Sequence, residues 1–169
     1  MTAQHVIEWL GLEPLPDEGG WFRQTWRSPE YVAAGVLGPR YRRECLVGTA
    51  IYYLVTDSVN GFSALHRLPT DEIYHFYLGD PVEQLRLHPD GRSEWIVLGA
   101  DLRAGQHVQH VAPRDVWQAT RLVAGGRWAL LGTTLAPGFD FSDYEPGSRS
   151  ALIAAYPDVA AAIVSFTRE

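Results

Sequence analysis

Apolar residues along the middle of the chain come in short runs, and turn-forming glycine, proline, aspartate and asparagine residues separate them. Such runs, recurring about every 8–12 residues, are typical of the short strands of a β-sandwich or barrel. No helical pattern alternates with them, so a parallel α/β fold is not expected. The pattern predicts strands over residues 21–26, 46–55, 62–68, 72–78, 82–87, 93–98, 107–111, 116–122 and 127–135.

The two ends of the chain carry helical patterns instead. Thr2 is a suitable N-cap for a helix over residues 4–10, and Ser148 can cap a second helix over residues 149–155. A third helix is predicted over residues 158–166, where apolar residues recur at helical spacing. We expect these helices to pack on the outside of the β core.

The length and composition of the chain fit one domain. A chain of 169 residues with 46% hydrophobic residues is long enough and apolar enough to bury a core. We expect a single domain over residues 1–169, with a core barrel over about residues 20–136 and C-terminal helices over about residues 148–167.

Charge and hydropathy exclude several classes of function. A formal net charge of −6 without a long basic run argues against binding to nucleic acid. No apolar run approaches the ~18–20 residues of a membrane-spanning helix, and the first residues lack the pattern of a signal peptide. All 14 basic residues are arginine, so no lysine can serve as a Schiff base or general base. We therefore expect a cytoplasmic protein that acts on or binds a small molecule.

Residues 61–79, GFSALHRLPTDEIYHFYLG, carry the densest titratable chemistry of the chain. Strand side chains alternate between two faces, so Glu72 and Tyr74 share one face of their strand while His75 points away from it. We predict that the two strands form a hairpin whose short turn brings His66 and Glu72 onto one interior wall. An imidazole and a carboxylate placed together can hold a divalent metal, or act as a general base and its orienting acid.

This segment resembles the first motif of the cupin superfamily, in which a glycine is followed by HxH, a glutamate and a second glycine. His66, Glu72 and Gly79 match that motif, whereas Leu68 stands where the second histidine is expected. The chain therefore keeps one of the two histidines of the motif.

The second cupin motif, PxGxxH in its core, maps onto residues 113–118. The proline is kept, Asp115 replaces the glycine, and Gln118 stands at the position of the metal-binding histidine. Two of the four metal ligands that are usual in the superfamily are therefore lost or replaced. A metal would have to use His66, Glu72 and Gln118, so we expect either no cofactor or one weakly held divalent metal.

More narrowly, the chain resembles the uncharacterised cupin-5 group, also known as the DUF985 family. The resemblance implies an all-β fold, namely a single cupin barrel (a double-stranded β-helix, jelly-roll-like) with short N- and C-terminal helices, and it implies a homodimer. The matching segments are LGLEP, EGGWFRQTWRS, TAIYYLV, FSALHRLPTDEIYHFYLGDP, PRDVWQA and LAPGFDFSDYE, in this order.

Three functions remain open from the sequence. The favoured one is an isomerase, epimerase or lyase in which His66 transfers a proton together with Glu72 and Tyr74, similar to cupin-barrel sugar-nucleotide epimerases that use no metal. The alternatives are a divalent-metal-dependent cupin enzyme and a non-catalytic protein that binds a sugar or another metabolite. The residues predicted to bind the ligand are Arg23, Tyr52, His75, Trp117 and Gln118.

Overall fold

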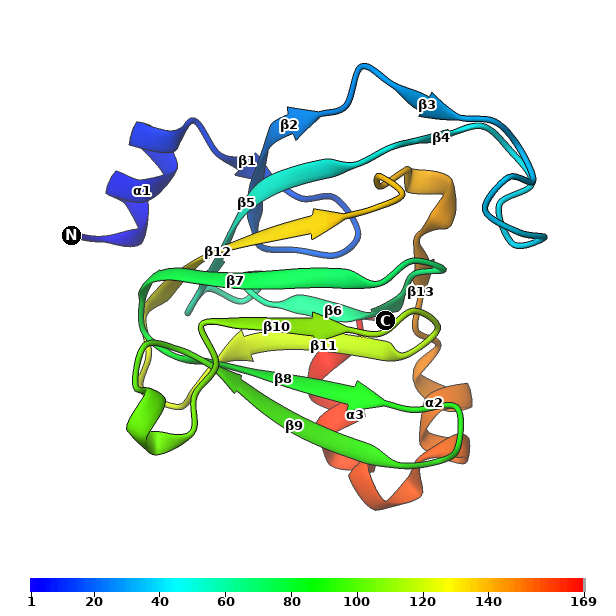
Figure 1. The fold of residues 1–169 in the computed structure, drawn as a ribbon. Coiled ribbons are helices and arrows are strands. Elements are labelled where there is room, and N and C mark those ends of the chain that lie inside the picture. Colours follow the sequence, from blue (N-terminus) through cyan, green and yellow to red (C-terminus); the bar gives the residue numbers. More distant parts are fainter. Residues whose placement is uncertain (169) are drawn as a thin grey trace.

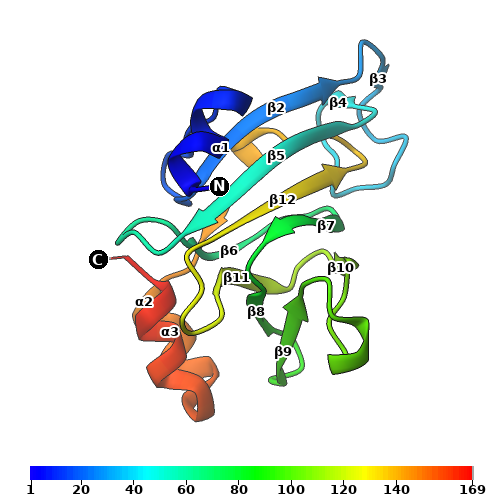
Figure 2. The same cartoon turned by 90° about the vertical axis from the view of Figure 1, so that its left-hand side faces the viewer.

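Two β-sheets face each other through most of the molecule, and helices lie on their outer sides (Figures 1 and 2). The computed structural model describes residues 1–168 of the chain. The first sheet has the strand order β1-β2-β5-β12-β7-β10, with bounds Glu13–Pro14, Trp21–Arg27, Thr49–Thr56, Trp128–Leu135, Glu72–Gly79 and Gln109–Ala112. The second has the order β13-β6-β11-β8-β9, with bounds Glu145–Pro146, Ser63–Arg67, Trp117–Leu122, Val82–Leu87 and Ser93–Leu98.

The predicted all-β architecture is confirmed. Every pair of neighbouring strands in the two sheets is antiparallel, and the strands over residues 82–87 and 93–98 have the predicted bounds. The predicted strand over residues 46–55 is divided, because its first residues belong to β4 (Cys45–Leu46). That strand pairs with β3 (Tyr31–Val32) in a separate two-stranded sheet.

The prediction of a hairpin over residues 62–78 is wrong, although both of its strands exist. Strand β6 pairs with β11 and β13 in the five-stranded sheet, whereas β7 pairs with β12 and β10 in the six-stranded sheet. The connection between them crosses from one sheet to the other, where the carbonyl of Leu68 accepts a hydrogen bond from the N–H of Asp115 at 2.9 Å. His66 and Glu72 therefore stand on opposite walls of the interior.

The helices form at the predicted places. Helix α1 (Ala3–Leu10) is capped by Thr2, whose hydroxyl accepts from the N–H of His5. Helix α2 (Arg149–Ala155) has the predicted bounds, but Ser148 makes no capping hydrogen bond; its hydroxyl lies 3.5 Å from that of Ser150. The third predicted helix begins as the 3₁₀ turn η3 (Pro157–Val159) and continues as α3 (Ala160–Phe166), and two further 3₁₀ turns are η1 (Leu102–Ala104) and η2 (Phe141–Asp143).

No single helix within residues 1–168 is long and apolar enough to cross a membrane. The segments Arg149–Ala155 and Pro157–Phe166 reach the necessary length and composition only as a pair, across a bend of 119°.

The apolar core is divided between the interior of the sandwich and the outer side of each sheet. Buried residues between the sheets include Val55, Tyr74, Leu98 and Leu131. Helices α2 and α3 cover the outer face of the five-stranded sheet, where their side chains bury Leu65, Leu85 and Leu87. Helix α1 covers part of the outer face of the six-stranded sheet, against Leu54 and Leu130. Strands β6 and β11 of the five-stranded sheet are therefore packed on both faces.

Candidate functional site

A cavity of about 320 Å³ lies between the two sheets, with His66 and Glu72 in its wall. This volume is within the range of sites for small molecules in proteins. The polar groups of the wall come from Glu13, Glu18, Gln24, Thr49, Tyr53, His66, Glu72, Tyr74 and Thr133. Most of the wall is apolar and includes Leu15, Phe22, Ile51, Leu135, Phe139 and Phe141.

Strand β6 holds His66 in the interior, where only 1% of the residue is exposed. Its Nδ1 lies 2.8 Å from the carbonyl oxygen of Ala64. A carbonyl can only accept, so we assign the Nδ1 hydrogen to this bond. The other ring nitrogen, Nε2, lies 3.2 Å from the amide nitrogen of Gln118, and Tyr144 stacks on the ring at 5.2 Å between centroids. Both ring nitrogens of His66 are therefore engaged.

Gln118 joins the two motif segments. It stands opposite His66 in the register of β11 and β6, and its amide nitrogen donates to Glu72 Oε2 at 2.7 Å. The amide thus links a histidine on one sheet to a carboxylate on the other. Its oxygen, Oε1, is buried and has no hydrogen-bond partner. An unpaired buried carbonyl is costly, which is often a sign of a functional site.

The turn before Gln118 has the backbone conformation that the cupin motif implies. Asp115, which replaces the motif glycine, has a φ of 63°. This left-handed region is most easily adopted by glycine, and aspartate and asparagine are the side chains that tolerate it best. The motif geometry is therefore retained although the residue has changed.

Glu72 is 7% exposed and has an unusual electrostatic environment. Burial raises its pKa, the charge of His66 opposes that rise, and the nearby carboxylate of Glu18 adds to it. Tyr74, on the same face of β7, is 1% exposed. Burial raises the pKa of Tyr74 well above its ordinary value, and the charges of Glu72 and Glu18 raise it further. Tyr74 is therefore a proton donor and not a phenolate at neutral pH.

Several polar residues of the cavity were not predicted from the sequence, among them Tyr53 and Glu18. Tyr53 lines the cavity, and its hydroxyl donates to the carbonyl of Gly19 at 2.9 Å. Glu18 accepts a hydrogen bond from the hydroxyl of Ser63 at 2.6 Å. Strand alternation could have identified Tyr53 as the neighbour of Tyr52 on the opposite face. Glu18 lies in a turn before β2, where no periodic pattern indicates the direction of a side chain.

Arg23 and Tyr52 do not line the cavity, contrary to the prediction that they bind its ligand. Both lie on the outer face of the six-stranded sheet, where the guanidinium of Arg23 lies 5.6 Å from the centroid of the Tyr52 ring. Their neighbours Phe22 and Ile51 point inward instead. The cavity side of both strands is therefore the face opposite to Arg23 and Tyr52.

Trp117 and His75 are also directed away from the cavity. Trp117 packs on the helix-covered side of β11, beneath the guanidinium of Arg67 at 4.6 Å from its ring centroid. His75 lies near Gln109 and Thr134 on the outer side of β7, at 3.2 Å and 3.3 Å from their polar atoms, and burial lowers its pKa. Of the five predicted ligand-binding residues, only Gln118 belongs to the His66–Glu72 cluster.

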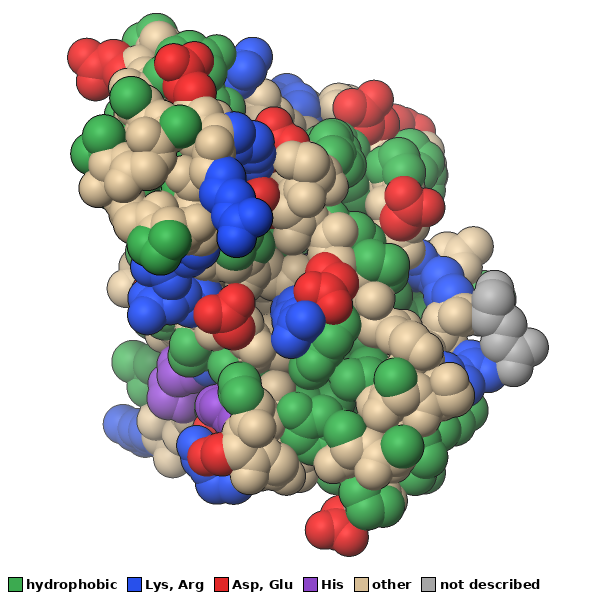
Figure 3. All heavy atoms as spheres, turned by 90° about the vertical axis from the view of Figure 1, so that its right-hand side faces the viewer, with side chains coloured by type: hydrophobic (Ala, Val, Ile, Leu, Met, Phe, Trp, Pro, Cys, Tyr) green, Lys and Arg blue, Asp and Glu red, His purple; other side chains and the backbone are tan. Residues whose placement is uncertain are grey.

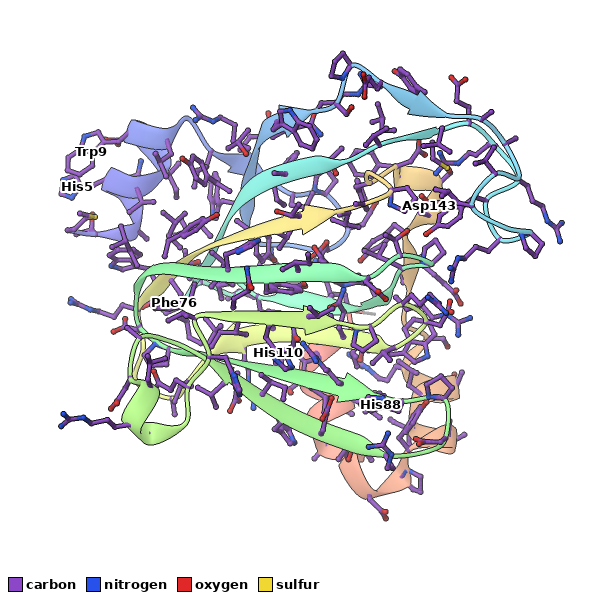
Figure 4. The ribbon with its side chains drawn as sticks, in the orientation of Figure 1. His5, Trp9, Phe76, His88, His110 and Asp143 are labelled. Atoms are coloured by element: carbon purple, nitrogen blue, oxygen red, sulfur yellow. The ribbon has the colours of Figure 1, made fainter. Side chains whose placement is uncertain are left out.

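The remaining histidines, His5, His88, His107 and His110, lie outside the cavity and make structural contacts. Figure 4 places His5 on α1, His110 on β10 and His88 at the end of β8. His5 takes part in the N-cap of α1, and His88 Nε2 lies 2.9 Å from Glu94 Oε1. The ring of His110 lies 4.9 Å from that of His107. None of these four histidines lines the cavity.

The residues at the cupin metal position do not fit a tightly bound transition metal. Leu68 contributes carbon to the cavity wall where the motif has a histidine. One imidazole, one carboxylate and one amide remain, and the amide nitrogen of Gln118 faces both of the other groups. Within residues 1–168 no group of three or more histidine, cysteine, aspartate or glutamate side chains could hold a metal ion. A neutral amide is a weak substitute for imidazole as a ligand.

Comparison with known proteins agrees with the motifs. The family model described as "Cupin superfamily (DUF985)" matches residues 4–146. The uncharacterized protein YML079W of Saccharomyces cerevisiae is 32% identical over 136 residues, which cover 75% of this chain and 66% of that protein. The matched stretch thus spans slightly less than two thirds of the yeast protein's length.

Solved structures give the same result. A hypothetical protein from Leishmania major has a TM-score of 0.87 and 28% identity, with full coverage of both chains. Protein SO0799 from Shewanella oneidensis has a TM-score of 0.84 and 30% identity, covering 99% of this chain and 98% of that one. An oxalate decarboxylase from Lactobacillus farciminis has a TM-score of 0.53 at 10% identity, over 95% of this chain and 43% of that one, and shares the fold alone.

Proposed function

The chain belongs to the DUF985 family of the cupin superfamily, and from this premise we propose that it is an enzyme of the isomerase, epimerase or lyase type. The cavity between the sheets holds one small molecule, and a proton is moved to or from a carbon atom of that molecule. The observation that carries the proposal is the buried array of His66, Gln118 and Glu72 in an otherwise largely apolar wall.

Glu72 is better suited than His66 to act as the general base. Gln118 occupies one oxygen of the Glu72 carboxylate, and the residue lines the cavity. Burial raises its pKa, which makes the carboxylate a stronger base than an exposed one. His66 has both ring nitrogens engaged, by Ala64 and Gln118. We therefore assign proton transfer to Glu72, and assign His66 a positioning role.

The proposed reaction begins with removal of a proton from a carbon atom of the ligand. The Glu72 carboxylate takes a proton from a C–H bond next to a carbonyl group, and the electron pair of that bond moves onto the carbonyl oxygen. Tyr74 lies on the same face of β7 and can donate a hydrogen bond to the developing oxyanion. Delivery of a proton to the opposite face of the same carbon gives epimerisation, and delivery to another carbon of the conjugated system gives isomerisation. Departure of a group from the adjacent carbon with its bonding electrons, as the carbonyl re-forms, gives elimination.

A non-catalytic binding protein is the second candidate. It is favoured by the engagement of both His66 nitrogens and by the apolar character of most of the wall. Such a protein would hold its ligand by packing and a few hydrogen bonds, without exchange of the ligand's hydrogen atoms.

Hydrogen exchange with solvent separates the two candidates without knowledge of the substrate. Purified protein is incubated in D₂O with an extract of small bacterial metabolites, and mass spectrometry follows the uptake of deuterium. We expect at least one metabolite to gain carbon-bound deuterium with the wild-type protein and with His75→Asn, whose imidazole lies outside the cavity. Labelling no greater than in a protein-free sample would contradict the enzymatic proposal and leave the binding protein.

A homodimer remains a prediction, which the family resemblance supports. Apolar side chains gather on the side of the molecule where α2 and β13 lie in Figure 1, as Figure 3 shows. Phe141, which is 63% exposed, is an example of a large apolar residue that a partner could cover. Light scattering at micromolar concentration should give twice the mass of the 18.9 kDa chain. A mass equal to one chain would contradict the prediction.

A further inference from the structure

The charged groups in the wall of the cavity are carboxylates. Glu13, Glu18 and Glu72 all line it, and among residues 1–168 no arginine does. The chain has no lysine. Arg168 is held elsewhere, because its guanidinium donates to the backbone carbonyls of Asp17 and Phe62 at 2.7 Å and 3.2 Å, and it lines a neighbouring, more open cavity. An anionic ligand would therefore meet like charges, with His66 as the single lining group of opposite charge among residues 1–168.

The same wall contains hydrogen-bonding capacity that the protein leaves unused. The amide oxygen of Gln118 is buried and has no hydrogen-bond partner, whereas the buried hydroxyl of Thr133 lies in the wall and interacts with Glu72. Glu18 accepts from Ser63 through Oε1, and Glu72 accepts from Gln118 through Oε2. Each carboxylate has two oxygens and about four lone-pair positions, so both keep free acceptor sites. A ligand that supplies several N–H or O–H donors would satisfy them.

The electrostatic effects on neighbouring groups agree with this geometry. The charge of Glu18 contributes to the raised pKa of Glu72, and the charges of both glutamates contribute to the raised pKa of Tyr74. Burial is the main cause of both raised pKa values, and the two glutamates add a negative potential inside the cavity. A bound cation would offset that potential and favour the ionised form of Glu72.

The remainder of the wall is suited to an apolar body. Phe22, Ile51, Leu135 and Phe139 offer carbon surface, and Phe139 and Phe141 meet edge to face at 5.1 Å between ring centroids. Aromatic faces attract organic cations as well as apolar groups. A volume of about 320 Å³ is enough for a bicyclic aromatic compound with a short side chain.

We propose that the natural ligand of this cavity is an amine, in which an apolar or aromatic body carries a protonated amino group that binds between Glu72 and Glu18. This inference rests on the proposed function only in using the same cavity. It departs from the comparison with sugar-nucleotide epimerases, whose diphosphate ligands would be repelled. The ammonium group supplies three donors and one positive charge, which match the free carboxylate oxygens.

Three probes of the same size and different charge test the proposal. Tryptamine, indole-3-ethanol and indole-3-propionate share one ring system, and their dissociation constants are measured by calorimetric titration at neutral pH. We expect tryptamine to bind about 10-fold or more tightly than the alcohol, and the propionate to bind weakest of the three. Equal affinity for amine and alcohol, preference for the propionate, or no binding of any probe at millimolar concentration would each overturn the proposal.

Variants of Glu18 and Glu72 test whether these two carboxylates bind the amino group. Glu18→Gln and Glu72→Gln should each weaken tryptamine binding about 10-fold and leave indole-3-ethanol binding unchanged. Asp158→Asn is the matched control, because it removes one negative charge from the exposed turn η3 outside the five-stranded sheet. An equal loss of affinity in the control would show a non-specific effect of net charge and contradict the site.

The affinity measurements are independent of turnover. Amine selectivity without deuterium exchange would support the cationic ligand and contradict the enzyme. Exchange of a neutral or anionic metabolite without amine selectivity would support the enzyme and contradict the cationic ligand.

Discussion

Glu72→Gln should reduce deuterium exchange catalysed in the cavity by about 10²–10⁴-fold, the usual contribution of a general base. Glutamine has nearly the same shape as glutamate but cannot take up a proton from carbon. The carboxylate is the cavity group whose raised pKa and incompletely occupied oxygens suit this role. The measurement compares initial rates of deuterium uptake into the labelled metabolite for the wild type, the variant and Asp158→Asn, which should keep the wild-type rate.

The same substitution should make the protein more stable at neutral pH. The folded state raises the pKa of Glu72, so it binds the carboxyl proton more readily than the unfolded chain does. The free energy of unfolding of the wild type therefore falls as the pH rises from the ordinary carboxyl range through the raised pKa. Glutamine is neutral at every pH and does not have this cost. Single stabilising substitutions commonly contribute about 0.5–2 kcal/mol, and each kcal/mol raises the Tm of a chain of this size by about 2–4 °C.

Thermal unfolding at several pH values checks the sign of this effect. The Tm of Glu72→Gln minus that of the wild type should increase with pH and become constant above the folded pKa of Glu72. A difference that is independent of pH, or that decreases as the pH rises, would contradict the assignment of a destabilising buried carboxylate. If Glu72 is a functional buried carboxylate, its replacement by glutamine lowers the exchange activity and raises the stability at neutral pH.

His66→Asn tests whether histidine positions Glu72 or carries the proton itself. The charge of His66 lowers the pKa of Glu72, so its removal should raise that pKa further. The acidic limb of the pH–rate profile should then move to higher pH, with part of the activity retained above the new pKa. Complete loss of exchange at every pH would instead return the role of base to His66.

The sequence was sufficient to predict the β architecture and the inward direction of His66 and Glu72, but not that they stand on opposite walls and are linked through Gln118. Both motif segments keep the spacing that the cupin resemblance requires, and Gln118 occupies the position that the second motif assigns to it. A hairpin and a crossing between sheets have the same local pattern, because each needs two strands and a turn. Only the pairing of β6 with β11 and of β7 with β12 distinguishes them.

Arg23, Tyr52 and Trp117 were misplaced because the pattern of a strand does not show which of its faces is inside. Alternation tells which side chains of a strand share a face, but it does not tell which face is inside. Strand β5 is packed on both faces, since Tyr53 lines the cavity while Tyr52 lies in the cluster under α1. Both faces therefore read as apolar in the sequence. Glu18 lies outside any strand, and its direction depends on Ser63, which is 45 residues away in the chain.

The two replaced cupin ligands change the character of the cavity in a consistent way. Leu68 adds apolar surface, and Gln118 replaces a metal bond by a neutral link between histidine and glutamate. Neither replacement brings a positive charge, so only His66 opposes the charge of Glu72 and Glu18 in the low-dielectric interior. That charge is available to a ligand, which is why the proposed base and the proposed amine selectivity arise from the same residues.

Phe166→Ala should lower the free energy of unfolding by about 3–5 kcal/mol, the usual cost of removing a fully buried phenylalanine. Phe166 ends α3, is 0% exposed and packs with Leu65 and Leu85 on the outer face of the five-stranded sheet. The guanidinium of Arg121 lies 4.7 Å from its ring centroid, so an additional favourable contact is lost. The residue lies beyond the family match, which ends at residue 146.

The large effect follows from what Phe166 supports. Leu65 precedes His66 on β6, so the strand that places the histidine in the cavity is held from behind by the helix that carries Phe166. Urea denaturation of Phe166→Ala should therefore show a much lower midpoint than Val164→Ala, a control on the same helix whose side chain is 47% exposed and whose loss should change stability by less than about 0.5 kcal/mol. A loss below about 1 kcal/mol for Phe166→Ala would mean that α3 is a dispensable addition to the barrel. A loss of the expected size would mean that the sheet presenting His66 and Gln118 depends on residues outside the family match for its stability.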